Sequence, residues 1–120
     1  MEGDQEKETE SDSVPDSHEY LMRGHIFERE GKNIDALECY SLAISLDHEF
    51  STAYYHRGAL YAKMGRNKDA LEDFTKTIKH DLEYADAYSS RAEIYEKMGM
   101  KSEAEADRKK AKTFDGSSKD

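Results

Sequence analysis

A repeat of 34 residues constrains this chain more than any other feature of its sequence. A tyrosine, an arginine, a glycine and an alanine each recur three times at that interval, with no insertion between copies. The positions are Tyr20, Tyr54 and Tyr88; Arg23, Arg57 and Arg91; Gly31, Gly65 and Gly99; and Ala36, Ala70 and Ala104. A period of this length with two helix-length segments per unit predicts stacked helical hairpins, because one hairpin alone cannot bury its apolar face.

The second unit shows how one hairpin is built. Tyr54, Gly58 and Tyr61 follow the spacing i, i+4, i+7 of one helical stripe, and the small Gly58 lets a second helix approach closely. We expect Gly65 to end this first helix, since glycine adopts the left-handed conformation without penalty, and Asn67 to N-cap the next helix. The apolar stripe of that second helix is Ala70, Leu71, Phe74 and Ile78. An ordinary three-helix bundle is the alternative, and three copies in register argue against it.

This pattern resembles the signature of the tetratricopeptide repeat (TPR) family. An aromatic residue, a glycine and a tyrosine are followed by an alanine and a phenylalanine, at Tyr54, Gly58, Tyr61, Ala70 and Phe74. The resemblance covers three units, residues 17–50, 51–84 and 85–118. It implies an all-α fold, a right-handed superhelical solenoid of three antiparallel helix hairpins. Where the family often has proline near the end of a unit, this chain has His48 and Leu82.

The chain before the first unit has a different composition. Residues 1–16 hold seven acidic residues and one lysine, so a net charge of −6 out of the chain's −9 lies here. Such a segment is predicted to be a disordered acidic tail that aids solubility. A regulatory role is the alternative, because Thr9 and Ser13 each have an acid three residues on. Asp16 and Glu19 are interpreted as a capping box that opens the first helix.

The third unit departs from the pattern in its second helix. The leucine, the aromatic residue and the isoleucine of the earlier stripes are replaced there by Glu105, Arg108 and Lys112. Terminal repeats need a polar outer face, because no further hairpin covers them. We therefore expect this helix to cap the array, and residues 115–120 to be frayed.

The recurring arginines are predicted to be partly buried, because each precedes the small residue at which two helices approach. A guanidinium there needs an acceptor. Asp73 and Asp107 occupy equivalent places on the second helices and are the predicted partners of Arg57 and Arg91, whereas Cys39 takes that place in the first unit. We interpret these pairs as structural ion pairs inside the hairpins.

The sequence is not typical of an enzyme or a metalloprotein. No two of the five histidines have the i, i+4 spacing of a helical metal site, although His18, His25 and His56 could converge on neighbouring first helices. Carboxylate pairs such as Glu93 and Glu96 are typical of a solvated helix face rather than of acid–base chemistry. We predict no catalysis, no metal and no cofactor.

Composition also bears on location. No run approaches 18 apolar residues and no apolar segment for export opens the chain, so we expect a cytoplasmic or nuclear protein without membrane insertion. The single cysteine, Cys39, cannot form an internal disulfide, which fits a reducing compartment. We interpret it as a small buried hydrophobic residue.

What remains is a binding surface on the first helices. In TPR proteins the face turned away from the second helix lines a concave groove that holds an extended peptide or a partner's helix. The resemblance therefore implies a protein-interaction adaptor or scaffold. One end of the groove is expected to be apolar, with Leu21 and Tyr55 as anchors, and the other acidic, which favours a partner with hydrophobic and basic residues. The predicted groove residues are Leu21, Met22, His25, Glu28, Tyr55, His56, Ala59, Ala62, Lys63, Asp86, Ser89, Ser90, Glu93, Glu96 and Lys97.

Two other functions are alternatives to a groove that binds a partner protein. Chaperone-docking TPR modules grip an acidic tail with lysine, arginine and asparagine side chains, and the matching places here hold Leu21, His25, His56, Asp86 and Ser90, none of which fits. RNA-binding helical repeats need a basic face, whereas residues 17–120 have 17 Lys and Arg against 20 Asp and Glu. We expect no nucleic-acid partner, and a chain that acts as a monomer or as a subunit of a larger complex. Binding on the convex side stays an alternative to the groove.

Overall fold

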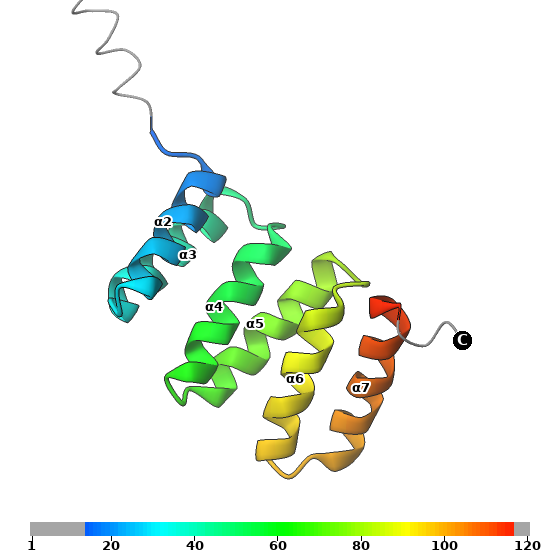
Figure 1. Cartoon of the computed structure of the whole chain (residues 1–120). Coiled ribbons are helices and arrows are strands. Elements are labelled where there is room, and N and C mark those ends of the chain that lie inside the picture. The colour runs from blue at the N-terminus through cyan, green and yellow to red at the C-terminus, as the bar shows by residue number, and fades with distance from the viewer. Residues whose placement is uncertain (1–13, 117–120) are drawn as a thin grey trace, which may run out of the picture.

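The computed structural model describes residues 14–116, and within that range the chain forms six helices and no strand (Figure 1). The helices are α2 (Ser17–Arg29), α3 (Asn33–Leu46), α4 (Ser51–Lys63), α5 (Asn67–His80), α6 (Ala85–Lys97) and α7 (Lys101–Asp115). They pair as α2 with α3, α4 with α5, and α6 with α7, and successive hairpins meet through α3 with α4 and α5 with α6. The prediction of an all-α stack of three hairpins is confirmed.

Each hairpin turns at a glycine with positive φ, namely Gly31 at 78°, Gly65 at 79° and Gly99 at 79°. At the middle turn the Arg66 N–H donates to the Tyr61 carbonyl at 2.8 Å, and the Gly65 N–H donates to the Ala62 carbonyl at 3.0 Å. This pair of bonds is the Schellman motif, which satisfies carbonyls left free at a helix end. The prediction that Gly65 ends the first helix is therefore confirmed.

The capping predictions had mixed outcomes. The capping box is confirmed, because the Glu19 N–H donates to Asp16 Oδ1 at 2.8 Å and the Asp16 N–H to Glu19 Oε1 at 3.1 Å. The prediction for Asn67 was wrong: Arg66 is the N-cap residue, it makes no side-chain cap bond, and Asn67 is already the first helical residue. The reason is the short Schellman turn, in which the next helix begins directly after the residue that follows the glycine.

The ends of the chain lie partly outside the described residues. Of the predicted acidic tail only Val14, Pro15 and Asp16 are described, and they precede α2 without regular structure. At the other end α7 runs through Asp115, and Gly116 caps it with φ of 86°. The remainder of the end that we predicted to fray, residues 117–120, is outside the described range.

Close packing inside the first two hairpins depends on a ring facing a glycine. Tyr40 and Phe74 are fully buried, and an added Cβ at Gly24 or Gly58 would lie only 2.4 Å from Tyr40 Cε1 or 2.9 Å from Phe74 Cε1. The third hairpin has Ala92 at the glycine's place and an exposed arginine at the ring's place. The second helices of the first two hairpins thus sit closer to their partners than a side chain would allow.

This contact predicts the effect of Gly58→Ala. Alanine is the better helix former by about 1 kcal/mol, yet its methyl group overlaps the buried Phe74 ring, so we expect the free energy of unfolding to fall by about 1–3 kcal/mol. Gly58→Leu should cost more. Urea unfolding followed by circular dichroism measures the change, and Gly58→Ala combined with Phe74→Leu should lose less than the two single changes together. A higher unfolding midpoint for Gly58→Ala alone would refute the close contact.

Candidate functional site

Two pockets open between the first helices of neighbouring hairpins. The pocket between α2 and α4 has a volume of about 530 Å³, and its lining is Met22, His25, Glu28, Arg29, His56 and Lys63. The pocket between α4 and α6 has about 260 Å³ and is lined by Ala59, Ala62, Lys63, Phe74, Ser90, Glu93, Ile94 and Lys97. Because Lys63 borders both, the pockets adjoin. Most of the predicted groove residues line one or the other.

The two expected anchors lie elsewhere. Leu21 is only 6% exposed and belongs to the core, so its prediction as a surface anchor was wrong. Tyr55 is half-buried, with ring centroids 5.7 Å from Phe74 and 5.1 Å from Tyr84, and its hydroxyl is 3.4 Å from Ser90 Oγ. Leu21 and Tyr55 are 34 positions apart and so occupy the same position of the repeat. Neither lines the groove, because this position of the first helix faces the following hairpin.

Three other predicted groove residues also line neither pocket. Ser89 shares the position of Leu21 and Tyr55, but no hairpin follows α6 and α7 in the described structure, so it is exposed at the open end. Glu96 turns toward its own second helix, where its Oε1 accepts a hydrogen bond from Arg108 Nη2 at 3.0 Å. Asp86 is exposed in the first turn of α6.

A polar cluster joins side chains that line the first pocket to the buried Tyr40. The hydroxyl of the buried Tyr40 donates to Glu28 Oε1 at 2.6 Å and lies 3.0 Å from His25 Nδ1. Lys63 Nζ is 2.8 Å from Glu28 Oε2, which ties α4 to α2. The His25 and His56 rings meet edge to face with centroids 4.4 Å apart. The sequence analysis did not predict that Tyr40 belongs to this site. The available signal was that unit one has a tyrosine, with a polar hydroxyl, at the position where unit two has Phe74.

These contacts set the charges in the cluster. Burial opposes the ionisation of Glu28, but hydrogen bonds from Lys63 and Tyr40 outweigh it and lower the pKa of the carboxyl group. Burial, and then the bond to Glu28, raises the pKa of Tyr40 far above its usual value. Burial, and then the proximity of His25, lowers the pKa of His56. At neutral pH the cluster therefore contains a charged Glu28, a protonated Tyr40 and a neutral His56.

The predicted convergence of three histidines holds for two of them. His18 stacks instead on Phe50, with ring centroids 5.3 Å apart. Among residues 14–116 no group of three or more His, Cys, Asp or Glu side chains is placed to hold a metal ion.

Cys39 is a buried free thiol, and burial raises its pKa. None of the described helices is long and apolar enough to cross a membrane.

The recurring arginines bridge three helices each in the second and third units. Arg57 donates through Nε and Nη2 to the two carboxylate oxygens of Asp73, at 2.8 and 2.9 Å, and through Nη1 to Ser41 Oγ of the preceding hairpin at 3.0 Å. The third unit repeats this arrangement with Arg91, Asp107 and Thr75. The predicted ion pairs are confirmed, and they occupy these arginines within the fold.

The first unit lacks this bridge. Arg23 is exposed, so its predicted partial burial was wrong. The reason is local: Cys39 stands where the other units have an aspartate, and no hairpin precedes α2 in the described structure.

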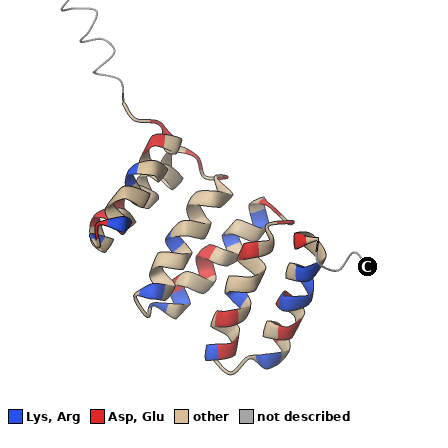
Figure 2. Cartoon of the chain, in the orientation of Figure 1, with Lys and Arg blue, Asp and Glu red and all other residues tan. Residues whose placement is uncertain are grey.

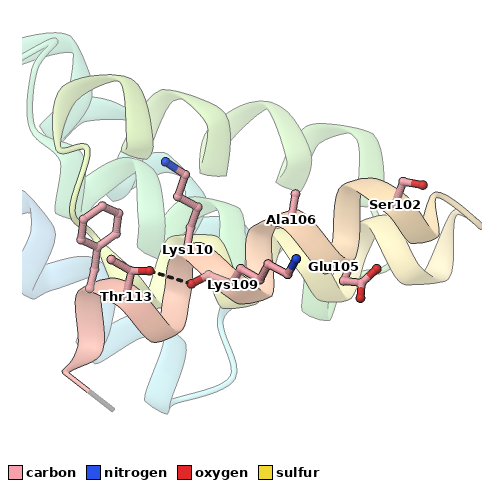
Figure 3. Close-up of a pocket in the computed structure, with 7 residues that line it drawn as sticks. Ser102, Glu105, Ala106, Lys109, Lys110 and Thr113 are labelled. Atoms are coloured by element: carbon pink, nitrogen blue, oxygen red, sulfur yellow. Dashed lines mark hydrogen bonds between the residues drawn. The ribbon is translucent and has the colours of Figure 1, made fainter. Parts of the chain in front are cut away.

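A further depression lies on α7 (Figure 3). It has about 490 Å³, and all of its lining comes from this one helix: Ser102, Glu105, Ala106, Lys109, Lys110, Thr113 and Phe114. Figure 3 shows these side chains spread along the helix, and the one hydrogen bond drawn between them joins Thr113 Oγ1 to the Lys109 carbonyl at 3.0 Å. An open surface on a single helix has no converging groups for chemistry.

The lowered pKa of His56 predicts a pH-dependent stability. The unfolded chain binds a proton at the ordinary pKa of 6.5, whereas folded His56 binds it only at lower pH. At a pH below the pKa of this histidine in the unfolded chain, the unfolded state binds more protons than the folded state. The free energy of unfolding therefore decreases as the pH falls. His56→Gln should reduce the loss measured by urea unfolding between about pH 7.5 and pH 5. His48→Gln, at an exposed turn residue, controls for removing a histidine; equal pH dependence in wild type and His56→Gln would contradict the assignment.

Comparison with known proteins agrees with this architecture. A model described as TPR repeat matches residues 24–65, and models described as tetratricopeptide repeat match residues 51–84 and 85–117. No curated protein matches the chain. Among solved structures, a crystal structure of MamA is 28% identical with a TM-score of 0.83, over 88% of this chain and 61% of that one. The chain thus spans about three fifths of the length of that MamA chain.

Two further structures are TPR domains with a bound peptide. The second TPR of Spaghetti (RPAP3) bound to the HSP90 peptide SRMEEVD is 26% identical with a TM-score of 0.80, over 95% of this chain and 99% of that one. The first TPR of the same protein, bound to the same peptide, is 19% identical with a TM-score of 0.80, over 85% and 81% of the two chains, and shows the fold alone. With three consecutive repeat matches and six helices in three hairpins, the chain belongs to the tetratricopeptide repeat family and contains three repeats.

Proposed function

We propose that this chain is an adaptor that binds an extended peptide or a helix of another protein in the groove formed by α2, α4 and α6. The observation that carries the proposal is the pair of adjoining pockets between these helices, which share Lys63. The peptide bound by the similar TPR domain of Spaghetti supports a ligand of this kind. A protein-interaction module of this family needs no catalytic group.

The side chains that line the two pockets support a different set of apolar contacts with the ligand from the one expected. With Leu21 in the core, the apolar contacts of the groove come from Met22 in the first pocket and from Ala59 and Ala62 over the Phe74 ring in the second. The small alanines leave space for an apolar side chain of the ligand. Figure 2 shows few charged residues along α4, which lies between the two pockets.

Charge in the groove also points to the ligand. Glu28 and Glu96 are paired with Lys63 and Arg108, whereas Glu93 has no ion pair with any residue of the described range. Figure 2 shows acidic and basic residues interspersed along α6. An unpaired carboxylate beside an apolar pocket favours a ligand with a basic residue next to its hydrophobic anchor. Arg29, Lys63 and Lys97 lie in the last turns of the first helices, where cations complement the helix dipole.

An acidic chaperone tail suits this groove poorly. Of the five positions that grip such a tail in clamp-type TPR domains, Leu21 is buried, and His25 packs against His56 inside the polar cluster. Ser90 lies beside the Tyr55 hydroxyl, and Asp86 is an exposed carboxylate that would repel the tail. The Asp86 carboxylate likewise opposes the binding of RNA.

The groove is tested by affinity capture of partners from cell extract. Ala62→Arg places a long charged side chain in the second pocket, and we expect it to weaken binding of the captured protein at least about tenfold, as for a central interface residue. The matched control is Arg108→Glu with Lys112→Glu on the outer face of α7, which should capture at wild-type level. Circular dichroism checks the helicity of both. If the control loses the partner and Ala62→Arg keeps it, the groove is not the binding surface.

The ligand's charge is tested separately. Glu93→Lys should slow association with the captured partner and weaken its dependence on salt, because exposed charges mainly steer the encounter. The peptide SRMEEVD should not bind the wild-type chain in a fluorescence anisotropy titration. Binding of that peptide at micromolar concentration would show that the ligand is acidic and that the charge argument is wrong.

A further inference from the structure

The outer edge of α2 is exposed where the equivalent edges of α4 and α6 are buried. Leu60 and Ile94 are 0% and 2% exposed, because α3 and α5 of the preceding hairpins cover them. The equivalent residue of the first unit, Ile26, is 46% exposed, and Tyr20 is half-buried whereas its equivalents Tyr54 and Tyr88 are 5% and 6% exposed. We call the surface formed by Tyr20, Arg23 and Ile26 the N-terminal edge.

Arg23 supplies a second, independent sign that this edge is incomplete. Each equivalent arginine has an aspartate in its own hairpin and a hydroxyl on the preceding one. Arg23 has no hydrogen bond or ion pair with any residue of the described range, and its guanidinium lies 5.8 Å from the centroid of the Tyr20 ring. The Cys39 thiol, whose pKa is raised by burial, offers no negative charge in place of the aspartate. Arg23 is therefore an exposed cation with which an anionic group of a partner can pair.

The inner hairpins show what kind of element covers such an edge. In α3 the apolar Leu37 and Ile44 flank Ser41, which accepts from Arg57. In α5 the apolar Leu71 and Ile78 flank Thr75, which accepts from Arg91. The covering helix thus has apolar residues at i and i+7 and an acceptor at i+4. A hydroxyl suffices in these places because Asp73 and Asp107 already neutralise the arginines.

We propose that the N-terminal edge docks an amphipathic helix of a partner protein, with an apolar side chain at i packed on Ile26, an apolar side chain at i+7 packed on Tyr20, and a carboxylate at i+4 bound to Arg23. A carboxylate replaces the hydroxyl because Arg23 has no aspartate of its own. This surface is separate from the groove between α2, α4 and α6, so it can be occupied by a different element.

Two other occupants fit less well. Residues 1–13 of this chain contain one large apolar residue, Met1, and cannot supply an apolar stripe. A second copy stacked end to end would present α7, whose residues at i, i+4 and i+7 are Glu105, Lys109 and Lys112. Lys109 would then face Arg23, and charges would replace both apolar contacts. The polar outer face of α7 thus disfavours self-stacking.

The probe is a helical peptide made to this pattern. It copies residues 33–46 with Ser41→Glu and Cys39→Ala, and a lactam bridge on the opposite face holds the helix. Titrated into the full chain, it should shift the methyl NMR signals of Ile26. Ile26→Lys should weaken binding at least about tenfold, which is 1.4 kcal/mol or more. Ile34→Lys is the matched control, because Ile34 is 69% exposed at the start of α3 and lies outside the edge.

A charge exchange separates a specific contact from non-specific adhesion. Arg23→Glu should lose the peptide, and a peptide with Ser41→Lys should restore binding to that variant while failing to bind the wild type. Any of three results would overturn the proposal: no methyl shift at millimolar peptide, wild-type affinity in Ile26→Lys, or shifts centred on Leu60 or Ala59, which would mean exchange with α3 or binding in the groove.

Discussion

The close approach of the two helices in a hairpin is the constraint on which the rest of this structure depends. In the first two hairpins a buried ring, Tyr40 or Phe74, lies against a glycine with no room for a methyl group. With the helices held this closely, one stripe of the second helix is left facing the next hairpin, and one face of the first helix is left facing the groove. The third hairpin has an exposed arginine in the ring's place, which is compatible with a stack that has no further hairpin at that end.

The arginine bridges add specificity to this packing. Arg57 joins α4 to α5 through a nearly buried carboxylate and to α3 through a hydroxyl, so one side chain fixes both the hairpin and its alignment with its neighbour. Desolvation offsets much of the attraction in a buried ion pair, and such a pair therefore selects an arrangement more than it adds to stability. Two helices that pack only through apolar stripes can shift by one helical turn relative to each other. The arginine bridge forms in only one of these alignments.

Much of the fold could be predicted from the sequence, because its signals are local and repeated: the period, the glycine turns, the Asp16 capping box and the partners of Arg57 and Arg91. The groove was harder, since the inside and outside of a first helix differ by one residue position. Leu21 lies in the core and Met22 on the surface, and a step of one residue rotates a side chain by about 100° around the helix axis. The rotation of one hairpin against the next decides which is exposed, and no short motif encodes that rotation. The bond between Tyr40 and Glu28 likewise joins positions that are apolar one unit later.

The two pockets differ in how freely their residues could change during evolution. In the first, the Tyr40 ring is part of the core while its hydroxyl holds Glu28, and Glu28 in turn holds Lys63 of the next hairpin. A substitution that altered recognition there would also disturb the stack. The second pocket contains the half-buried Ala59 and Ala62 and the exposed Glu93. Replacing any of these three residues leaves the buried contacts of the first pocket in place. New binding preferences can therefore accumulate between α4 and α6 at little cost to folding, while the pocket between α2 and α4 retains its chemistry.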